Sequence, residues 1–316
     1  MGKAYAPSIS DKLIRREQSQ FSAGNTMNQT EQLLERAQRL IERLEGVFAP
    51  TTAEPDWNCI AFRWQRGTGL QAITRPHKVQ LDDILCVDRV KAEITRNTRQ
   101  FVEGRSANNT LLWGSRGTGK SSLIKALLNE FADQGLRLIE VEKHDLIDLT
   151  SIVELIQDRP ERFLLYCDDL SFEADDASYK SLKAILDGSI SAPPENVLIY
   201  ATSNRRHLLP EFKQENQDVH IVEGEIHQNE SVEEKISLSE RFGLWLSFYP
   251  FSQDQYLTIV DHWLTRLGAR TTADESIRLE ALRFALKRGS RSGRVALQFA
   301  RDWAGRLPED LPDEKD

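Results

Sequence analysis

The sequence predicts an α/β protein with a parallel five-stranded sheet between two layers of helices, a three-layer αβα arrangement. Three observations lead to this prediction. Short, nearly continuous apolar runs alternate with helical segments along residues 109–251, as in parallel sheets that are covered on both faces. A Gly-rich turn at residues 114–121 joins the first of these strands to a helix. Paired carboxylates follow a later strand, at the edge where such sheets bind ligands.

The expected elements alternate along the chain. The predicted strands cover residues 109–113, 136–141, 162–167, 196–202 and 244–251. Helices are predicted at residues 85–102, 122–128, 149–157 and 178–186. Residues 57–80 are expected to be irregular or strand-like. After the last strand only helical periodicity remains, at residues 253–267, 274–288 and 293–306, which predicts a helical lid.

Composition changes divide the chain into four predicted parts. They are a mobile N-terminus with an amphipathic helix and linker (1–55), the α/β domain with its lead-in segment (56–251), the helical lid (252–307) and an acidic tail (308–316). The amphipathic helix, at residues 30–48, carries an apolar stripe at helical spacing. This N-terminal helical extension either packs on its own domain or docks onto a partner.

The bulk composition is that of an ordinary globular protein. The chain has 316 residues, of which 40% are hydrophobic and 28% charged. It has no run of 18 apolar residues and no apolar N-terminal signal segment, so no membrane association is expected. Its three cysteines are far apart, which predicts neither disulfides nor zinc and favours the cytoplasm. The net charge of −8 argues against a surface that binds nucleic acid throughout, but leaves room for a local basic patch.

Residues 114–121 match the phosphate-binding loop pattern G-x-x-x-x-G-K-[ST]. Glycines allow the backbone amides of such a loop to turn inward, and the following helix adds positive charge at its N-terminus. Lys120 is expected to reach the β- and γ-phosphates and Ser121 to ligate Mg²⁺. The predicted nucleotide-binding residues are Gly114, Ser115, Arg116, Gly117, Thr118, Gly119, Lys120, Ser121 and Ser122. The sequence therefore predicts a P-loop NTPase that binds ATP with Mg²⁺.

Two further strand ends carry polar residues suited to this site. Asp168 and Asp169 directly follow the strand 162–167. The first is expected to hold Mg²⁺ through water and the second to orient the attacking water. Asn204 follows the strand 196–202 and is expected to contact the γ-phosphate or that water. The alternatives are carboxylates that cap the next helix and an asparagine that serves only a turn.

The phosphate loop, the strand followed by Asp168 and Asp169, and the strand followed by Asn204 come in the order found in the AAA+ ATPases, which the chain resembles over residues 81–307. The resemblance implies that Asn204 is the first sensor and that Arg294, in Ser292-Gly293-Arg294-Val295, is the second sensor of the lid. It also implies that Arg241, in Arg241-Phe242-Gly243, is an arginine finger acting on a neighbouring subunit. Residues 168–173 and 241–248 resemble, in detail, an uncharacterised bacterial AAA+ family known only as a domain of unknown function. The catalytic set implied is Lys120, Asp168, Asp169, Asn204, Arg241 and Arg294.

One residue departs from the AAA+ pattern. The family usually has glutamate where this chain has Asp169, and aspartate is one methylene shorter. A misplacement of about 1 Å in a positioning group costs on the order of 100-fold in rate. Slow hydrolysis is therefore expected, unless the backbone compensates or Glu173 contributes. Arg205 and Arg206 are reserve candidates for the arginine roles.

Two functions compete at this stage. The favoured one is an oligomeric switch or remodeller, in a ring or partial ring, that engages an unknown protein client through the N-terminal helix or residues 211–240, which hold nine acidic and two basic residues. The alternative is a nucleic-acid loader or initiator, because residues 281–306 hold seven basic residues and one acidic residue. A salt-titrated DNA-binding assay separates the two. A small-molecule kinase would share the loop but not the contexts of Arg241 and Arg294. Metal binding by His220 and His227 is not favoured.

Overall fold

The computed structural model describes residues 54–172, 177–187, 194–204 and 238–306, all of which belong to one unit, Thr52–Asp316. Several predicted features lie outside these ranges. They are the helix at 30–48, residues 211–237 of the acidic segment, the tail at 308–316, Glu173, Arg205, Arg206, His220 and His227.

All five predicted parallel strands are present. They are β3 (Thr110–Gly114), β4 (Leu136–Glu140), β5 (Arg162–Cys167), β6 (Val197–Ser203) and β7 (Leu244–Phe248). The strand order in the sheet is β2-β1-β4-β5-β6-β3-β7. The predicted fold class is thus confirmed, but the described residues form a seven-stranded sheet where the sequence predicted five strands.

The two additional strands come from the segment that was expected to be irregular or strand-like. They are β1 (Ala61–Gln65) and β2 (Gly69–Ala72), which pair antiparallel as a hairpin, while β1 pairs in parallel with β4. Phe62 of β1 lies opposite Ile139 of β4 and is fully buried. Burial of this side chain explains the pairing, which joins segments more than 70 residues apart and cannot be recognised from local sequence.

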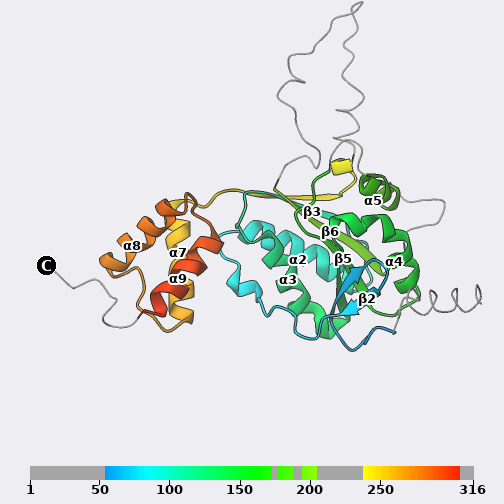
Figure 1. The fold of residues 1–316 in the computed structure, drawn as a ribbon, viewed down its shortest axis with the longest axis horizontal. Helices are drawn as coiled ribbons and strands as arrows, with labels where there is room; N and C mark the ends of the chain where they lie inside the picture. Colours follow the sequence, from blue (N-terminus) through cyan, green and yellow to red (C-terminus); the bar gives the residue numbers. More distant parts are fainter. Residues whose placement is uncertain (1–53, 173–176, 188–193, 205–237, 307–316) are drawn as a thin grey trace, which may run out of the picture. The chain divides into compact units, whose positions relative to one another are not determined.

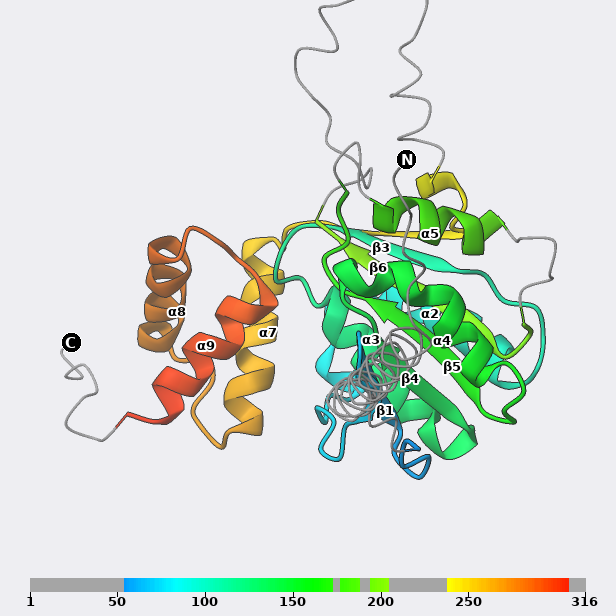
Figure 2. The same ribbon diagram turned by 45° about the vertical axis from the view of Figure 1, so that its right-hand side comes forward.

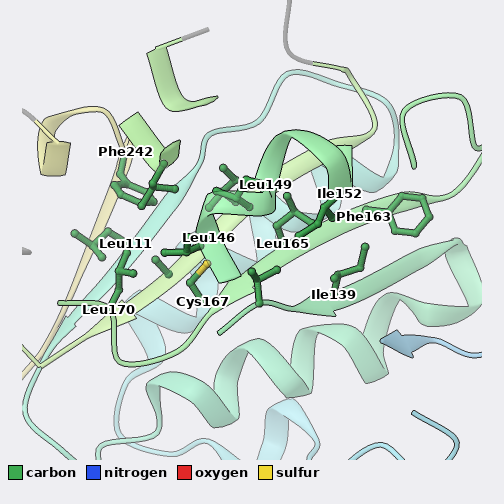
Figure 3. Close-up of a cluster of buried hydrophobic side chains, with 14 of the residues drawn as sticks. Leu111, Ile139, Leu146, Leu149, Ile152, Phe163, Leu165, Cys167, Leu170 and Phe242 are labelled. Atoms are coloured by element: carbon green, nitrogen blue, oxygen red, sulfur yellow. The ribbon is translucent and has the colours of Figure 1, made fainter. Parts of the chain in front are cut away.

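Helices cover both faces of the sheet (Figures 1 and 2). One face packs against α2 (Asp88–Val102) and α3 (Lys120–Phe131), and the other against α4 (Leu149–Ile156) and α5 (Ala177–Asp187). Alternate side chains of β5 point to opposite faces of the sheet and pack into the two hydrophobic cores there. Phe163, Leu165 and Cys167 belong to the α4–α5 core shown in Figure 3, whereas Leu164 and Tyr166 face α2 and α3.

The lid consists of α7 (Gln253–Arg266), α8 (Glu275–Lys287) and α9 (Gly293–Ala304), which are seen in Figure 2. Their buried side chains form a hydrophobic core of their own. Side chains of Ser252, Asp274 and Ser292 cap the N-termini of these helices. The lid contacts the α/β part through Asp83, whose buried carboxylate pairs with Arg266 and lies 3.3 Å from His262. No helix in the described ranges is long and apolar enough to span a membrane.

Candidate functional site

The phosphate loop lies at the carboxyl end of β3, between β6 and β7 in the sheet, and leads directly into α3. Gly119 immediately precedes the helix and has a φ of 101°. L-residues with a side chain rarely adopt this left-handed conformation, so the glycine is required where the chain turns into α3. The N-terminus of α3, which is the positive end of the helix dipole, therefore faces the site.

Lys120 is the buried cation of this site, with only 7% of its surface exposed. Its Nζ donates to the carbonyl oxygens of Gly114 and Ser115, each at 2.8 Å, and to Oδ1 of Asn204 at 3.2 Å. Burial lowers the pKa of the Lys120 amine from 10.5 to about 8, although Asp169 and Asp168 favour the charged form. The amine is thus poorly solvated and close to oxygens that a phosphate group can replace.

Asp168 and Ser121, the predicted Mg²⁺ pair, are in direct contact. The Ser121 hydroxyl donates to Oδ1 of Asp168 at 2.7 Å, and the Thr202 hydroxyl donates to the same oxygen at 2.6 Å. Burial acts to raise the pKa of Asp168, but the hydrogen bonds from Thr202 and Ser121 outweigh it and hold the pKa below its ordinary value. An ionised carboxylate beside a hydroxyl is a hard oxygen donor set, which fits an Mg²⁺ ion held mainly by phosphate and water.

Asn204 links Lys120 to Asp169. Its Oδ1 accepts from Lys120, and its Nδ2 donates to Oδ1 of Asp169. Asp169 has a φ of 50°, and its backbone N–H donates to the Thr202 hydroxyl at 2.9 Å. Aspartate tolerates this left-handed conformation better than most residues. The turn after β5 therefore brings the second carboxylate to the amide that follows β6.

The N-terminus of α9 approaches the phosphate loop from the lid. The backbone N–H of Arg294 donates to the carbonyl oxygen of Gly117 at 3.2 Å. A β-carbon on Gly117 would lie 2.9 Å from the Ser292 hydroxyl, so glycine permits this close approach. The Arg294 charge acts on Lys120, and this arginine therefore joins the predicted cluster.

Arg241 is the one member of the predicted catalytic set that does not join the cluster. It precedes β7, whose residues Leu244 to Phe248 pair in parallel with Thr110 to Gly114. Arg241 therefore lies beyond the amino end of β7, whereas the phosphate loop begins at the carboxyl end of β3. Its guanidinium pairs with the Asp187 carboxylate at the end of α5.

Three residues near the cluster were not predicted to act there. Thr202 bonds both to Asp168 and to the amide of Asp169, Tyr166 lies next to Ser121 and Asp168, and Ser292 contacts the loop at Gly117. The available signal for the first two was a polar residue near the end of an otherwise apolar strand. No comparable signal marked Ser292, because its contact depends on how the lid is placed.

The lowered pKa of Lys120 predicts that nucleotide affinity depends on pH. Bound phosphates hold the amine charged, so above about pH 8 the free site must take up a proton on binding. The affinity for ADP in EDTA should then fall by up to about tenfold per pH unit. Calorimetric titrations across this range test the prediction. Lys120→Arg is the control, because a guanidinium stays charged and should give no such decline. A flat profile for the unmodified protein would contradict the prediction.

Comparisons with known proteins bear on the fold and the family. The family described as "Protein of unknown function (DUF815)" matches residues 57–307. This agrees with the resemblance that the motifs indicated. No curated protein shows significant sequence similarity to the chain.

Several solved structures are similar in fold. The RuvB Holliday junction branch migration motor of Thermotoga maritima matches with 17% identity and a TM-score of 0.48, over 71% of this chain and 63% of that one. AMPPCP-bound DnaA from Aquifex aeolicus matches with 18% identity and a TM-score of 0.44, over 69% and 62% of the two chains. The E. coli MS115-1 HORMA:CdnC:Trip13 complex matches with 13% identity and a TM-score of 0.44, over 72% and 91%. The match thus covers less than two thirds of the RuvB and DnaA chains.

Proposed function

The chain belongs to the DUF815 family, and we propose that it is an AAA+ ATPase that hydrolyses ATP slowly and acts as an oligomeric switch or remodeller of a protein partner. The observation that supports this most is the cluster at the carboxyl ends of β3, β5 and β6. There Lys120, Asn204 and Asp169 form one connected group, and Ser121 and Asp168 form a second. These are the residue types that a site for phosphoryl transfer to water requires.

Each residue of the cluster has a proposed role in cleaving the β–γ phosphoanhydride. Lys120 would exchange its loop carbonyls for β- and γ-phosphate oxygens, and Arg294 would add positive charge from the lid. Mg²⁺, held by Ser121 and through water by Asp168, would neutralise charge on the phosphates. Asp169 would orient the attacking water. Asn204, whose amide bonds both to Lys120 and to the Asp169 carboxylate, would hold that carboxylate in place.

The geometry around Asp169 supports slow hydrolysis. Its carboxylate is short and already accepts a hydrogen bond from Asn204. Its backbone is fixed in a left-handed conformation by the bond to Thr202. The side chain therefore has little freedom to make up for the methylene that a glutamate would supply. Positioning of the water is then poorer than in a site with glutamate, and the rate should be lower.

The position of Arg241 supports a site completed by a second copy of the chain. The five residues of β7 separate Arg241 from the loop end of the sheet, a distance of about 16 Å at roughly 3.3 Å per residue. An arginine side chain cannot span this distance to the site of its own subunit. If Arg241 contributes to hydrolysis, it therefore acts in trans, which is the basis for proposing a homo-oligomeric ring or partial ring.

The class of partner is proposed from the sequence and from one surface feature. The segments proposed to engage a protein client lie almost entirely outside the described residues. The nucleic-acid alternative has one structural observation in its favour, since Lys287 at the end of α8 and Arg288 and Arg291 in the turn before α9 are exposed. Exposed basic residues at a helix turn are common on protein surfaces, so the protein partner stays the favoured proposal.

Dependence of the ATPase rate on protein concentration tests the proposed function. The rate per subunit should rise with concentration as neighbouring copies supply Arg241, and the particle size should be larger in ATP than in ADP. Steady-state phosphate release and light scattering on the same samples measure both quantities. A constant rate from a monomer over the whole concentration range would contradict the oligomeric part of the proposal. Absence of ATP hydrolysis at every concentration would contradict the ATPase itself.

A further inference from the structure

Tyr166 carries a buried hydroxyl next to the proposed metal ligands. The residue is 0% exposed, and its oxygen has no hydrogen-bond partner of normal geometry among the described residues. The side chain lies beside the Ser121 hydroxyl and the Asp168 carboxylate. An unpaired buried hydroxyl costs about 1–3 kcal/mol of stability, so its presence in an otherwise apolar strand calls for a reason.

The pleat of β5 explains why Tyr166 reaches this place. Residues 164 and 166 face α2 and α3, and Tyr166 comes two residues before Asp168, which directly follows the strand. The side chain therefore extends beneath the first turn of α3, where Ser121 lies. A phenylalanine or leucine at this position would fill the same apolar core without a polar atom.

The neighbouring polar atoms are committed to one another. The Ser121 hydrogen goes to Oδ1 of Asp168, and the same oxygen also accepts from Thr202. The Tyr166 hydroxyl lies beside Ser121 and Asp168 but makes a hydrogen bond of normal geometry with neither. The Asp168 carboxylate beside it has spare acceptor capacity, since an ionised carboxylate has about four lone-pair sites.

We propose that Tyr166 is a positioning residue for the metal side of the site. When nucleotide and Mg²⁺ occupy the site, the Tyr166 hydroxyl donates a hydrogen bond to the Asp168 carboxylate. This bond fixes the orientation of the carboxylate relative to the Ser121 hydroxyl. Residues that hydrogen-bond a metal ligand set its direction and typically change metal affinity by 10- to 100-fold. This inference rests on the proposed function, because it assumes that Ser121 and Asp168 meet Mg²⁺.

Tyr166→Phe tests the inference, because it removes one oxygen and keeps the ring. The Mg²⁺ concentration that gives half of the Mg²⁺-dependent gain in ATP affinity should rise about tenfold. ADP affinity in EDTA should stay within twofold. The melting temperature without ligand should be unchanged or higher, because phenylalanine removes an unpaired buried hydroxyl. Calorimetric titration and thermal unfolding supply these three readouts.

Tyr200→Phe is the matched control. Tyr200 is also fully buried, on the neighbouring strand β6, but its hydroxyl is bonded to Asn97 at 3.0 Å and to Thr98 at 2.9 Å. Its loss should lower the melting temperature without ligand and leave the Mg²⁺ requirement unchanged. The two variants thus separate a role in metal positioning from a role in folding.

Two outcomes would overturn the inference while the proposed function stands. One is an unchanged Mg²⁺ requirement in Tyr166→Phe when the unmodified protein binds ATP in an Mg²⁺-dependent manner. The other is a lower melting temperature, as in Tyr200→Phe, together with an equal loss of ADP affinity in EDTA, which would assign Tyr166 to folding alone. If the unmodified protein showed no Mg²⁺-dependent nucleotide binding, the proposed function would fall and the role of Tyr166 with it.

Discussion

Lys120→Ala should weaken ATP binding about 100-fold, which corresponds to loss of charge-assisted hydrogen bonds worth about 1.5–3 kcal/mol. Lys120 is the buried cation of the site, and its amine lies among two loop carbonyls and the Asn204 amide oxygen. A phosphate that replaces those oxygens gains a full positive charge in a poorly solvated place. Alanine leaves the loop amides, the end of α3, Arg294 and Mg²⁺ to bind the phosphates. Fluorescent-nucleotide titration measures the loss.

The control for Lys120→Ala is Lys180→Ala, which makes the same chemical change at an exposed residue of α5. It should leave ATP affinity within twofold. Thermal unfolding of both variants shows whether the fold is retained. ATP affinity that is unaffected in a folded Lys120→Ala variant would contradict a phosphate-binding role for this loop.

Arg241→Ala should leave ATP affinity within twofold and lower the hydrolysis rate at high protein concentration by about 10³-fold, the lower end of the range for an arginine finger supplied in trans. The reason is positional, because Arg241 lies at the amino end of β7 and its own site lies at the opposite end of the sheet. Only the site of a neighbouring copy can lose a charge when this arginine is removed. Parallel measurements of binding and phosphate release check both halves of the prediction.

Asp187→Ala is the matched control for Arg241→Ala. Asp187 pairs with Arg241 at the end of α5, so a purely structural role for the pair predicts similar losses from either substitution. A partly exposed ion pair of this kind contributes about 0–1 kcal/mol to stability. If Arg241 is a finger, Asp187→Ala keeps most of the activity because the arginine is still present. Equal losses in the two variants would assign Arg241 to structure alone.

Local features of the sequence predicted most of the α/β fold. The strand β5 was predicted with the bounds that the structure shows, and α7, α8 and α9 within two residues at either end. These elements have strong apolar periodicity, clear capping residues such as Ser252 and Ser292, or both. The phosphate loop was predicted because its glycines and lysine fall at fixed spacing within one short stretch, residues 114–121. Where the physical cause is local, the sequence was sufficient.

Contacts between distant segments were not predictable in the same way. The hairpin of β1 and β2 joins the sheet through the pairing of β1 with β4, which places Phe62 opposite Ile139. The bond from Thr202 to Asp168 requires β6 to lie beside β5, and the Arg241–Asp187 pair spans 54 residues. The order of strands in a parallel sheet is set by packing of the whole domain. A pattern read along one segment does not contain that order.

Mixing Lys120→Ala with Arg241→Ala subunits tests the central claim, that a neighbouring copy completes each ATP site. At an ATP concentration between the two dissociation constants, the first variant is mostly without nucleotide but keeps Arg241, and the second binds nucleotide but lacks Arg241. Neither should hydrolyse ATP appreciably alone, while the mixture should recover a substantial fraction of the rate of the unmodified protein, since Lys120→Ala subunits supply arginine to the intact sites of their neighbours. A mixture that forms the same oligomer and stays as inactive as its components would contradict the account.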